Sequence, residues 1–154
     1  MDSQGSFAIH LSDGYNGGEK GRAMAVLMFK PRFVRLVRSG VKQQTIRPVR
    51  KRPIEAGDAL ALRYWSGLPY RSPQVTICYA TCTAVWDIEI RGVDAGLSTC
   101  IVNGDELTPF QRSTLARDDG FDDWAGMWDW FKANHGLPFK GVVISWKGTG
   151  PCQN

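Results

Sequence analysis

The sequence predicts an α+β domain, most simply a small β-barrel of five or six strands that carries three short helices. Apolar residues alternate with polar ones over much of the chain, which is typical of strands, and recur at helical spacing in one early segment and two late ones. The length of 154 residues, with 43% hydrophobic and 22% charged residues, is that of a single globular domain with a buried core.

Tails are expected at both ends of this domain. Residues 1–22 are rich in Gly, Ser and Asp and have little periodicity, which predicts a flexible N-terminal tail. The folded domain is expected at 23–148, followed by a C-terminal tail at 149–154. No segment has the length of a membrane-spanning helix, so we expect no membrane partner.

The first half of the domain is expected to contain one helix among strands. Pro31 suits the first turn of a helix, and Gly40 suits the left-handed residue that ends one. In chain order we expect a strand at 25–29, a helix at 31–39, an extended segment at 43–49, an alternating strand at 59–65 and a long strand at 75–90.

The second half of the domain changes from strand spacing to helical spacing. Asn103-Gly104 is a strong signal for a two-residue hairpin turn. A capping threonine followed by proline predicts a helix over 108–117, and Asp122 or Asp123 caps another. A strand at 138–146 closes the fold. The apolar stripe of the last helix contains Trp124, Met127, Trp128 and Phe131.

The four cysteines do not form a recognisable disulfide or metal pattern. Cys78 and Cys82 lie in a strand-like run, where they would stand about 13 Å apart, too far for a disulfide or a shared metal ion. Cys100 and Cys152 are solitary, and the two histidines are far apart in the sequence. We therefore expect reduced thiols, a cytoplasmic location, no metal and no cofactor.

Positive charge is concentrated near the start of the domain. The formal net charge of +4 and the pI near 9.0 permit a polyanionic partner without requiring one. Between Lys30 and Arg52 there are nine Lys or Arg residues and no acid, whereas residues 118–129 include five Asp residues and no base. This distribution predicts a molecule with two electrical sides, one of which offers cations to an anionic ligand.

Lys42, Thr45 and Arg47 are the candidate reactive group. If residues 40–43 form the turn after the early helix, Lys42 leans over the start of the next strand beside Thr45, and Arg47 shares the strand face of Thr45. A lysine beside a threonine hydroxyl is a minimal nucleophile–base pair when the ammonium is partly desolvated or is oriented by a carboxylate. The alternative is a solvated strand surface, where lysine and threonine are common.

The loop WSGLPYRSPQ, at residues 65–74, is a second candidate. It combines aromatic, guanidinium and amide groups, which suit a planar ligand that stacks and forms hydrogen bonds, such as a nucleobase. The alternative is a loop whose aromatic rings fold back on the core. The expected ligand contacts beside Arg47 are Tyr64, Trp65, Tyr70, Arg71 and Gln74.

The pattern GxKxxTxR at residues 40–47, after an early strand and a short helix and ahead of Gly57-Asp58, resembles the ASCH domain family. The resemblance covers about residues 25–146. It implies a PUA-like fold, which is a β-barrel with flanking helices that is associated with RNA binding and modified-base recognition. Among ASCH proteins, the chain is most similar to the larger, phage- and prophage-associated type, with the hairpin at Asn103-Gly104 as an insertion.

The resemblance also implies a reaction. In the small bacterial amidohydrolases of the family, which remove the acetyl group from N4-acetylcytidine, the motif lysine and threonine act with a glutamate ahead of the late helix. Carried over by position, these residues are Lys42 and Thr45, and the glutamate falls on Asp119, which is one methylene shorter. In this reaction Thr45 attacks the acyl carbon and Lys42 accepts its proton. Asp119 then holds Lys42, while Arg47 stabilises the oxyanion.

The resemblance therefore predicts a domain that binds a nucleobase, nucleoside or RNA end and hydrolyses an N4-acylated cytidine. The shorter carboxylate of Asp119 leaves a second hypothesis open, a non-catalytic module that binds RNA or a modified base with the same cations. A third hypothesis is a ribonuclease in which Lys42 and Arg47 contact phosphate. The lack of a histidine near the motif, which would serve as a general base, counts against it.

Overall fold

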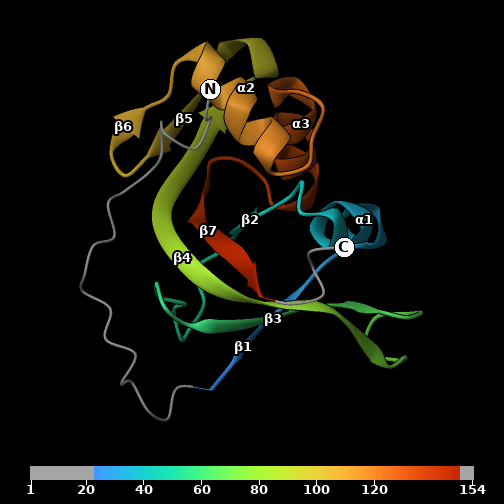
Figure 1. Ribbon diagram of the computed structural model, residues 1–154. Helices are drawn as coiled ribbons and strands as arrows, with labels where there is room; N and C mark the ends of the chain where they lie inside the picture. The colour runs from blue at the N-terminus through green and yellow to red at the C-terminus, as the bar shows by residue number, and fades with distance from the viewer. Residues whose placement is uncertain (1–22, 150–154) are drawn as a thin grey trace. The chain divides into compact units, whose positions relative to one another are not determined.

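The computed structural model describes residues 23–149 as an α+β fold, shown in Figure 1. These residues form three α-helices, one short 3-10 helix and a mixed sheet of seven strands. In chain order the elements are β1 (Ala25–Met28), α1 (Pro31–Ser39), β2 (Gln44–Arg47), β3 (Ala59–Trp65), β4 (Gln74–Gly92), η2 (Ala95–Leu97), β5 (Ser98–Val102), β6 (Asp105–Glu106), α2 (Pro109–Asp118), α3 (Trp124–Asn134) and β7 (Phe139–Thr149).

The α+β class and the three helices are confirmed, whereas the expected five or six strands are seven in the described residues. The extra strand is β6, a two-residue strand that pairs with β5 across the predicted Asn103-Gly104 turn. The predicted N-terminal tail and residues 150–154 lie outside the described residues.

The sheet does not close into the expected barrel. Its main path runs β1-β3-β4-β5-β6, and β7 pairs with β2 and β4. The β1–β3 pair is parallel, and the β3–β4, β4–β5 and β5–β6 pairs are antiparallel. Closure requires the two end strands of a path to pair, and β6, with two residues, offers too few backbone groups for a further ladder.

The described residues fall into two compact units. One, which we call the helical unit, contains Gln44–Pro53 and Trp86–Ile144 and holds β2, η2, β5, β6, α2 and α3. The other, which we call the sheet unit, contains residues 23–43, Ile54–Val85 and residues 145–149 and holds β1, α1 and β3. The strands β4 and β7 contribute residues to both units.

The helical unit is built on helix ends that the sequence signals locally. The side chain of Thr108 accepts a hydrogen bond from the backbone N–H of Gln111, and the Gln111 side chain accepts one from the backbone N–H of Thr108, forming a capping box for α2. Asp123 caps α3 by accepting from the backbone N–H of Gly126. The predicted stripe of α3 is buried: Trp124, Met127, Trp128 and Phe131.

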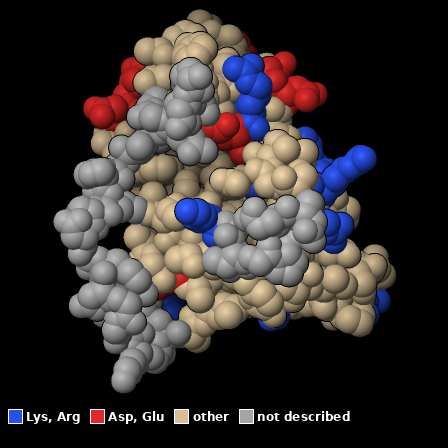
Figure 2. Space-filling view, in the orientation of Figure 1, with Lys and Arg blue, Asp and Glu red and all other residues tan. Residues whose placement is uncertain are grey.

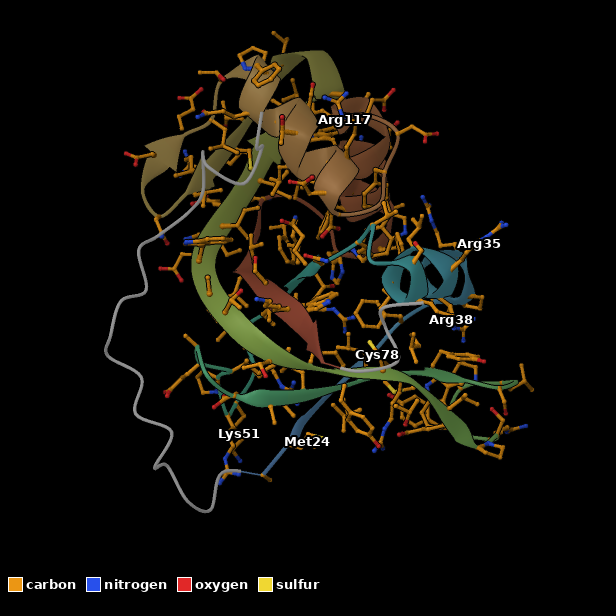
Figure 3. All side chains as sticks on the ribbon, in the orientation of Figure 1. Met24, Arg35, Arg38, Lys51, Cys78 and Arg117 are labelled. Atoms are coloured by element: carbon orange, nitrogen blue, oxygen red, sulfur yellow. The ribbon has the colours of Figure 1, made fainter. Side chains whose placement is uncertain are left out.

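The sheet unit packs apolar strands against α1. Leu27 of β1 pairs with Leu62 of β3, and both are buried. The inner side of α1 buries Phe33 and Val37, and the helix ends at Gly40, whose φ of 83° is left-handed as predicted. On the outer side, arginines are exposed, and Figure 3 shows Arg35 and Arg38 directed away from the helix.

The expectation of four reduced thiols is wrong at Cys78, which is disulfide-bonded. The strand-spacing argument excluded only a bond between Cys78 and Cys82. Cys82 and Cys100 are free and buried, and burial raises the pKa of each thiol to about 12. Cys152 lies outside the described residues. The cytoplasmic location was expected because all four thiols were expected to be reduced, and the disulfide at Cys78 removes that reason.

No helix among residues 23–149 combines the length and the apolar character needed to cross a bilayer.

Gly141 in β7 is required for close packing against β2. A Cβ at this position would overlap the backbone carbonyl oxygen of Arg47 and lie 2.7 Å from a ring carbon of Phe139. We expect Gly141→Ala to lower the free energy of unfolding by about 3 kcal/mol, measured by urea denaturation, which is the upper end of the usual cost of overpacking, because the overlap is with backbone that cannot rotate away.

Gly136→Ala is the matched control. A Cβ there meets no atom within 4 Å, although the φ of 82° makes alanine strained. This variant therefore isolates the backbone strain, about 1 kcal/mol. Equal losses of stability in the two variants would contradict the role of Gly141 in the approach of β7 to β2.

Candidate functional site

The strand β2 carries the centre of the candidate site in the helical unit. It pairs with β7, and Gln44, Thr45 and Ile46 are all buried. Buried apolar residues are ordinary on such a strand, but adjacent buried polar residues are not. Each polar group on β2 therefore needs a hydrogen-bond partner within the fold.

Arg47 and Thr45 lie on the same face of β2, as the sequence predicts. The Nε–H of Arg47 donates a hydrogen bond of 2.9 Å to the hydroxyl oxygen of Thr45. This bond fixes the direction of the hydroxyl and occupies one of its two acceptor positions, while its own O–H remains a donor. A cationic donor on this oxygen also stabilises negative charge that develops there.

Asp119 comes directly after α2 and is the C-cap residue of that helix. Its backbone N–H donates to the carbonyl oxygens of Leu115 and Ala116, and its side chain is only 4% exposed. The carboxylate accepts a hydrogen bond of 3.5 Å from the side-chain amide of Gln44. The end of α2 thus positions a buried carboxylate beside β2.

The guanidinium of Arg47 lies in a partly desolvated, charged environment. Burial lowers its pKa to about 10, the charge of Asp119 raises the pKa, and the charge of Arg50 lowers it. Since this value is well above neutral, Arg47 stays cationic under physiological conditions. The helical unit therefore brings a cation, a carboxylate, an amide and a hydroxyl into one polar cluster. It consists of the buried Gln44, Thr45 and Asp119 and the half-buried Arg47.

Lys42 belongs to the sheet unit and is one of its most deeply buried side chains, at 2% exposure. Its Nζ lies 4.7 Å from the centre of the Phe33 ring, a cation–π geometry. Its backbone N–H donates to the carbonyl oxygen of Leu36 at the end of α1. The alternative of a solvated surface for Lys42 and Thr45 is therefore wrong, because both side chains are buried.

The residues of the aromatic loop also belong to the sheet unit. The rings of Trp65 and Tyr70 lie 5.0 Å apart, and Tyr70 is 88% exposed, so the loop does not fold all its aromatics onto the core. Arg71 is exposed and Tyr64 is half-buried. The amide oxygen of Gln74 accepts a hydrogen bond of 3.0 Å from Arg63.

Gln44 and Phe33 are members of these arrangements that the sequence analysis missed. The spacing of Phe33 in α1 is that of any core residue, so nothing in the sequence shows that its ring also contacts Lys42. Gln44 lies between the lysine and the threonine of the motif. It is a polar residue next to Thr45 on the same strand, and this position is the signal by which it could have been included as a candidate. Its partner Asp119 is 75 positions away, which no local pattern shows.

The described residues hold no group of three His, Cys, Asp or Glu side chains suited to a metal ion. Comparison of the chain with protein-family models, curated proteins and solved structures found no match. A proposal for the function therefore rests on the geometry of the chain's own residues and on the motif at 40–47.

Removal of the Asp119 carboxylate should destabilise the fold. Asp119→Ala takes the nearby negative charge from Arg47 and the hydrogen-bond acceptor from the buried Gln44 amide. We expect the free energy of unfolding to fall by about 1–3 kcal/mol, the usual cost of leaving a buried hydrogen-bonding group without its partner. Asp122→Ala, at an exposed aspartate nearby in sequence, should change stability by no more than about 0.5 kcal/mol. Similar losses in both variants would show that Asp119 is not a buried partner of this cluster.

Proposed function

We propose that this chain is a PUA-like ASCH domain that binds a nucleobase, nucleoside or RNA end and hydrolyses N4-acylated cytidine. The observation that supports the proposal is the polar cluster of Gln44, Thr45, Arg47 and Asp119, of which all but the half-buried Arg47 are buried. Burial of a guanidinium and a carboxylate costs folding free energy that an apolar core would not cost. Thr45 and Arg47 are positions of the ASCH-like motif, and Asp119 stands where the family's glutamate is expected.

The first chemical step transfers the acyl group to the protein. The Thr45 hydroxyl oxygen attacks the acyl carbon, and its proton passes to the amine of Lys42, the base that the resemblance assigns. The tetrahedral intermediate then loses the C–N4 bond, and N4 takes the proton from Lys42 as cytidine leaves. The product of this step is an ester on Thr45.

The second step restores the enzyme. A water molecule attacks the ester carbon and gives a proton to Lys42, which acts again as the base. The bond between the acyl carbon and the Thr45 oxygen breaks, that oxygen takes a proton back from Lys42, and the carboxylic acid leaves. No oxidant, reductant or further reactant is needed.

The structure supports a different role for Arg47 from the one the resemblance implies. Its Nε–H already contacts the Thr45 hydroxyl oxygen at 2.9 Å. In this position the cation stabilises the charge that develops on the attacking oxygen. We therefore assign Arg47 to orienting and activating the nucleophile, rather than to the carbonyl oxygen of the substrate.

A non-catalytic base-binding module is the second candidate function, and one observation favours it. The Asp119 carboxylate is one methylene shorter than the family's glutamate and is already bonded to the Gln44 amide. A misplacement of about 1 Å in a catalytic group can cost about 100-fold in rate. The same cluster can then recognise a base without cleaving it.

If Thr45 is the nucleophile, Thr45→Ala should abolish release of cytidine from N4-acetylcytidine, followed by chromatography. Binding of the nucleoside should stay within about threefold, because the lost interaction acts only along the reaction coordinate. Thr45→Ser keeps a hydroxyl and should keep measurable turnover. Full activity in Thr45→Ala would exclude this residue as the nucleophile. Binding of N4-acetylcytidine by the unmodified chain without any turnover would favour the binding module.

The length of the carboxylate at position 119 decides between the enzyme and the binding module. Asp119→Glu extends the side chain by one methylene, as in the family's small amidohydrolases, and we expect turnover of N4-acetylcytidine to rise or to stay unchanged. Asp119→Asn removes the charge at constant size and should lower turnover. If the unmodified chain binds N4-acetylcytidine but does not hydrolyse it, and Asp119→Glu creates activity, the short carboxylate is what separates binding from catalysis.

A further inference from the structure

The β3–β4 hairpin of the sheet unit ends in an exposed aromatic tip that the reaction described above does not use. The loop at residues 66–73 joins Trp65, the last residue of β3, to Gln74, the first of β4. Tyr70 is 88% exposed and Leu68 is 67% exposed, and both lie in this loop. Figure 1 shows the hairpin extending beyond β1, its neighbour in the sheet unit.

The tip is held in one conformation by its own hydrogen bonds. The backbone N–H of Ser66 donates to the carbonyl oxygen of Pro73 at 3.0 Å, and the N–H of Gly67 donates to the Ser72 hydroxyl at 2.9 Å. The Ser72 hydroxyl in turn donates to the carbonyl oxygen of Leu68 at 2.8 Å. Because its groups are bonded within the loop, the tip is preformed and a ligand need not order it.

Tyr70 has an unusual backbone for an aromatic residue. Its φ is 64°, in the left-handed region where glycine is the default and a bulky side chain costs about 1–2 kcal/mol. The strain places the phenol ring in solvent, 5.0 Å from the Trp65 ring and inclined to it by 46°. A strained residue that exposes a large ring, where glycine would make the same turn without strain, indicates a function for the ring.

The charge of the hairpin favours an anionic occupant. Residues 59–85 contain no Asp or Glu, and their charged side chains are Arg63 and Arg71. Arg71 is exposed and adjacent to Tyr70. Figure 2 shows the face over this hairpin, at the lower right, without acidic atoms and with basic atoms at its edge.

We propose that the tip of the β3–β4 hairpin binds single-stranded nucleic acid, with a base stacked on Tyr70 and the adjoining phosphate contacted by Arg71. Exposed aromatic rings and neighbouring guanidinium groups are the usual means by which proteins hold unpaired bases and the phosphate chain. A protein partner would need about 800 Å² on each side for a stable interface, far more than one loop tip provides. The choice of a nucleic acid rests in part on the proposed function, and it extends the ligand from a nucleoside or an RNA end to a length of single strand held at a separate site.

The test measures, by fluorescence anisotropy, the affinity of the chain for a labelled, unstructured oligouridylate or oligoadenylate strand. Tyr70→Ala should weaken binding by about 5- to 100-fold, the usual effect of losing one stacked base. Tyr70→Phe keeps the ring and should bind within about twofold of the unmodified chain. Tyr70→Gly removes the ring and also relieves the left-handed strain, so it should lose affinity without a lower melting temperature.

A matched control is Tyr79→Ala, since Tyr79 is 43% exposed on β4 outside the tip. It should leave affinity for the strand unchanged. Equal effects of Tyr70→Ala and Tyr79→Ala, or no binding of RNA and DNA strands by the unmodified chain, would overturn the proposal. Binding to vesicles of phosphatidylserine that depends on Tyr70, without binding to either strand, would overturn it in favour of a lipid surface.

Two further measurements separate this proposal from the proposed function. Thr45→Ala removes the proposed nucleophile and should bind the strand as tightly as the unmodified chain does, because the ring that holds the strand is not part of the reacting group. Loss of strand affinity in Thr45→Ala would overturn a separate tip site. If no acylated cytidine is bound or hydrolysed but strand affinity depends on Tyr70, the proposed function fails and the tip site stands. A parallel DNA strand shows whether the ribose hydroxyl contributes to recognition.

Discussion

The attraction between Asp119 and the partly desolvated guanidinium of Arg47 is the interaction on which the candidate site depends. Burial alone works against a cation, and the nearby carboxylate offsets part of that cost. Arg47 in turn orients the Thr45 hydroxyl, so one charge interaction sets the geometry of a neutral group next to it. The absence of a side chain at Gly141 allows the backbone of β7 to lie against the carbonyl of Arg47, which holds this part of β2 in place.

Elements with local signals could be predicted from the sequence. The caps at Thr108 and Asp123, the hairpin turn at Asn103-Gly104 and the left-handed Gly40 each depend on residues within one turn of chain. The closure of the sheet has no such signal, because it depends on whether distant strands pair. The prediction of a closed barrel was wrong for that reason. The path of the sheet ends at β6, a strand of two residues, and no local pattern in the sequence shows that this strand lacks a further partner.

Spacing alone could predict the candidate site only along β2, and Asp119 was predicted only through the resemblance to ASCH domains. Thr45 and Arg47 are two positions apart, so alternation places them on one face, and their hydrogen bond follows. The contribution of Gln44 could not be predicted, because its partner is 75 positions away. The burial of Lys42 was also missed, since lysine is rarely buried and only the packing of α1 puts the Phe33 ring against its ammonium.

The position of Asp119 at the end of α2 makes the site sensitive to helix length. The capping box at Thr108 sets where α2 begins. The ten residues of the helix follow, and Asp119 comes directly after them, with its carboxylate beside Gln44 of β2. One inserted residue within α2 would rotate the carboxylate by about 100° and move it about 1.5 Å along the helix axis. In related sequences that share this site, insertions should therefore gather in the turns that flank α2, while the number of residues between the cap and the acid stays constant.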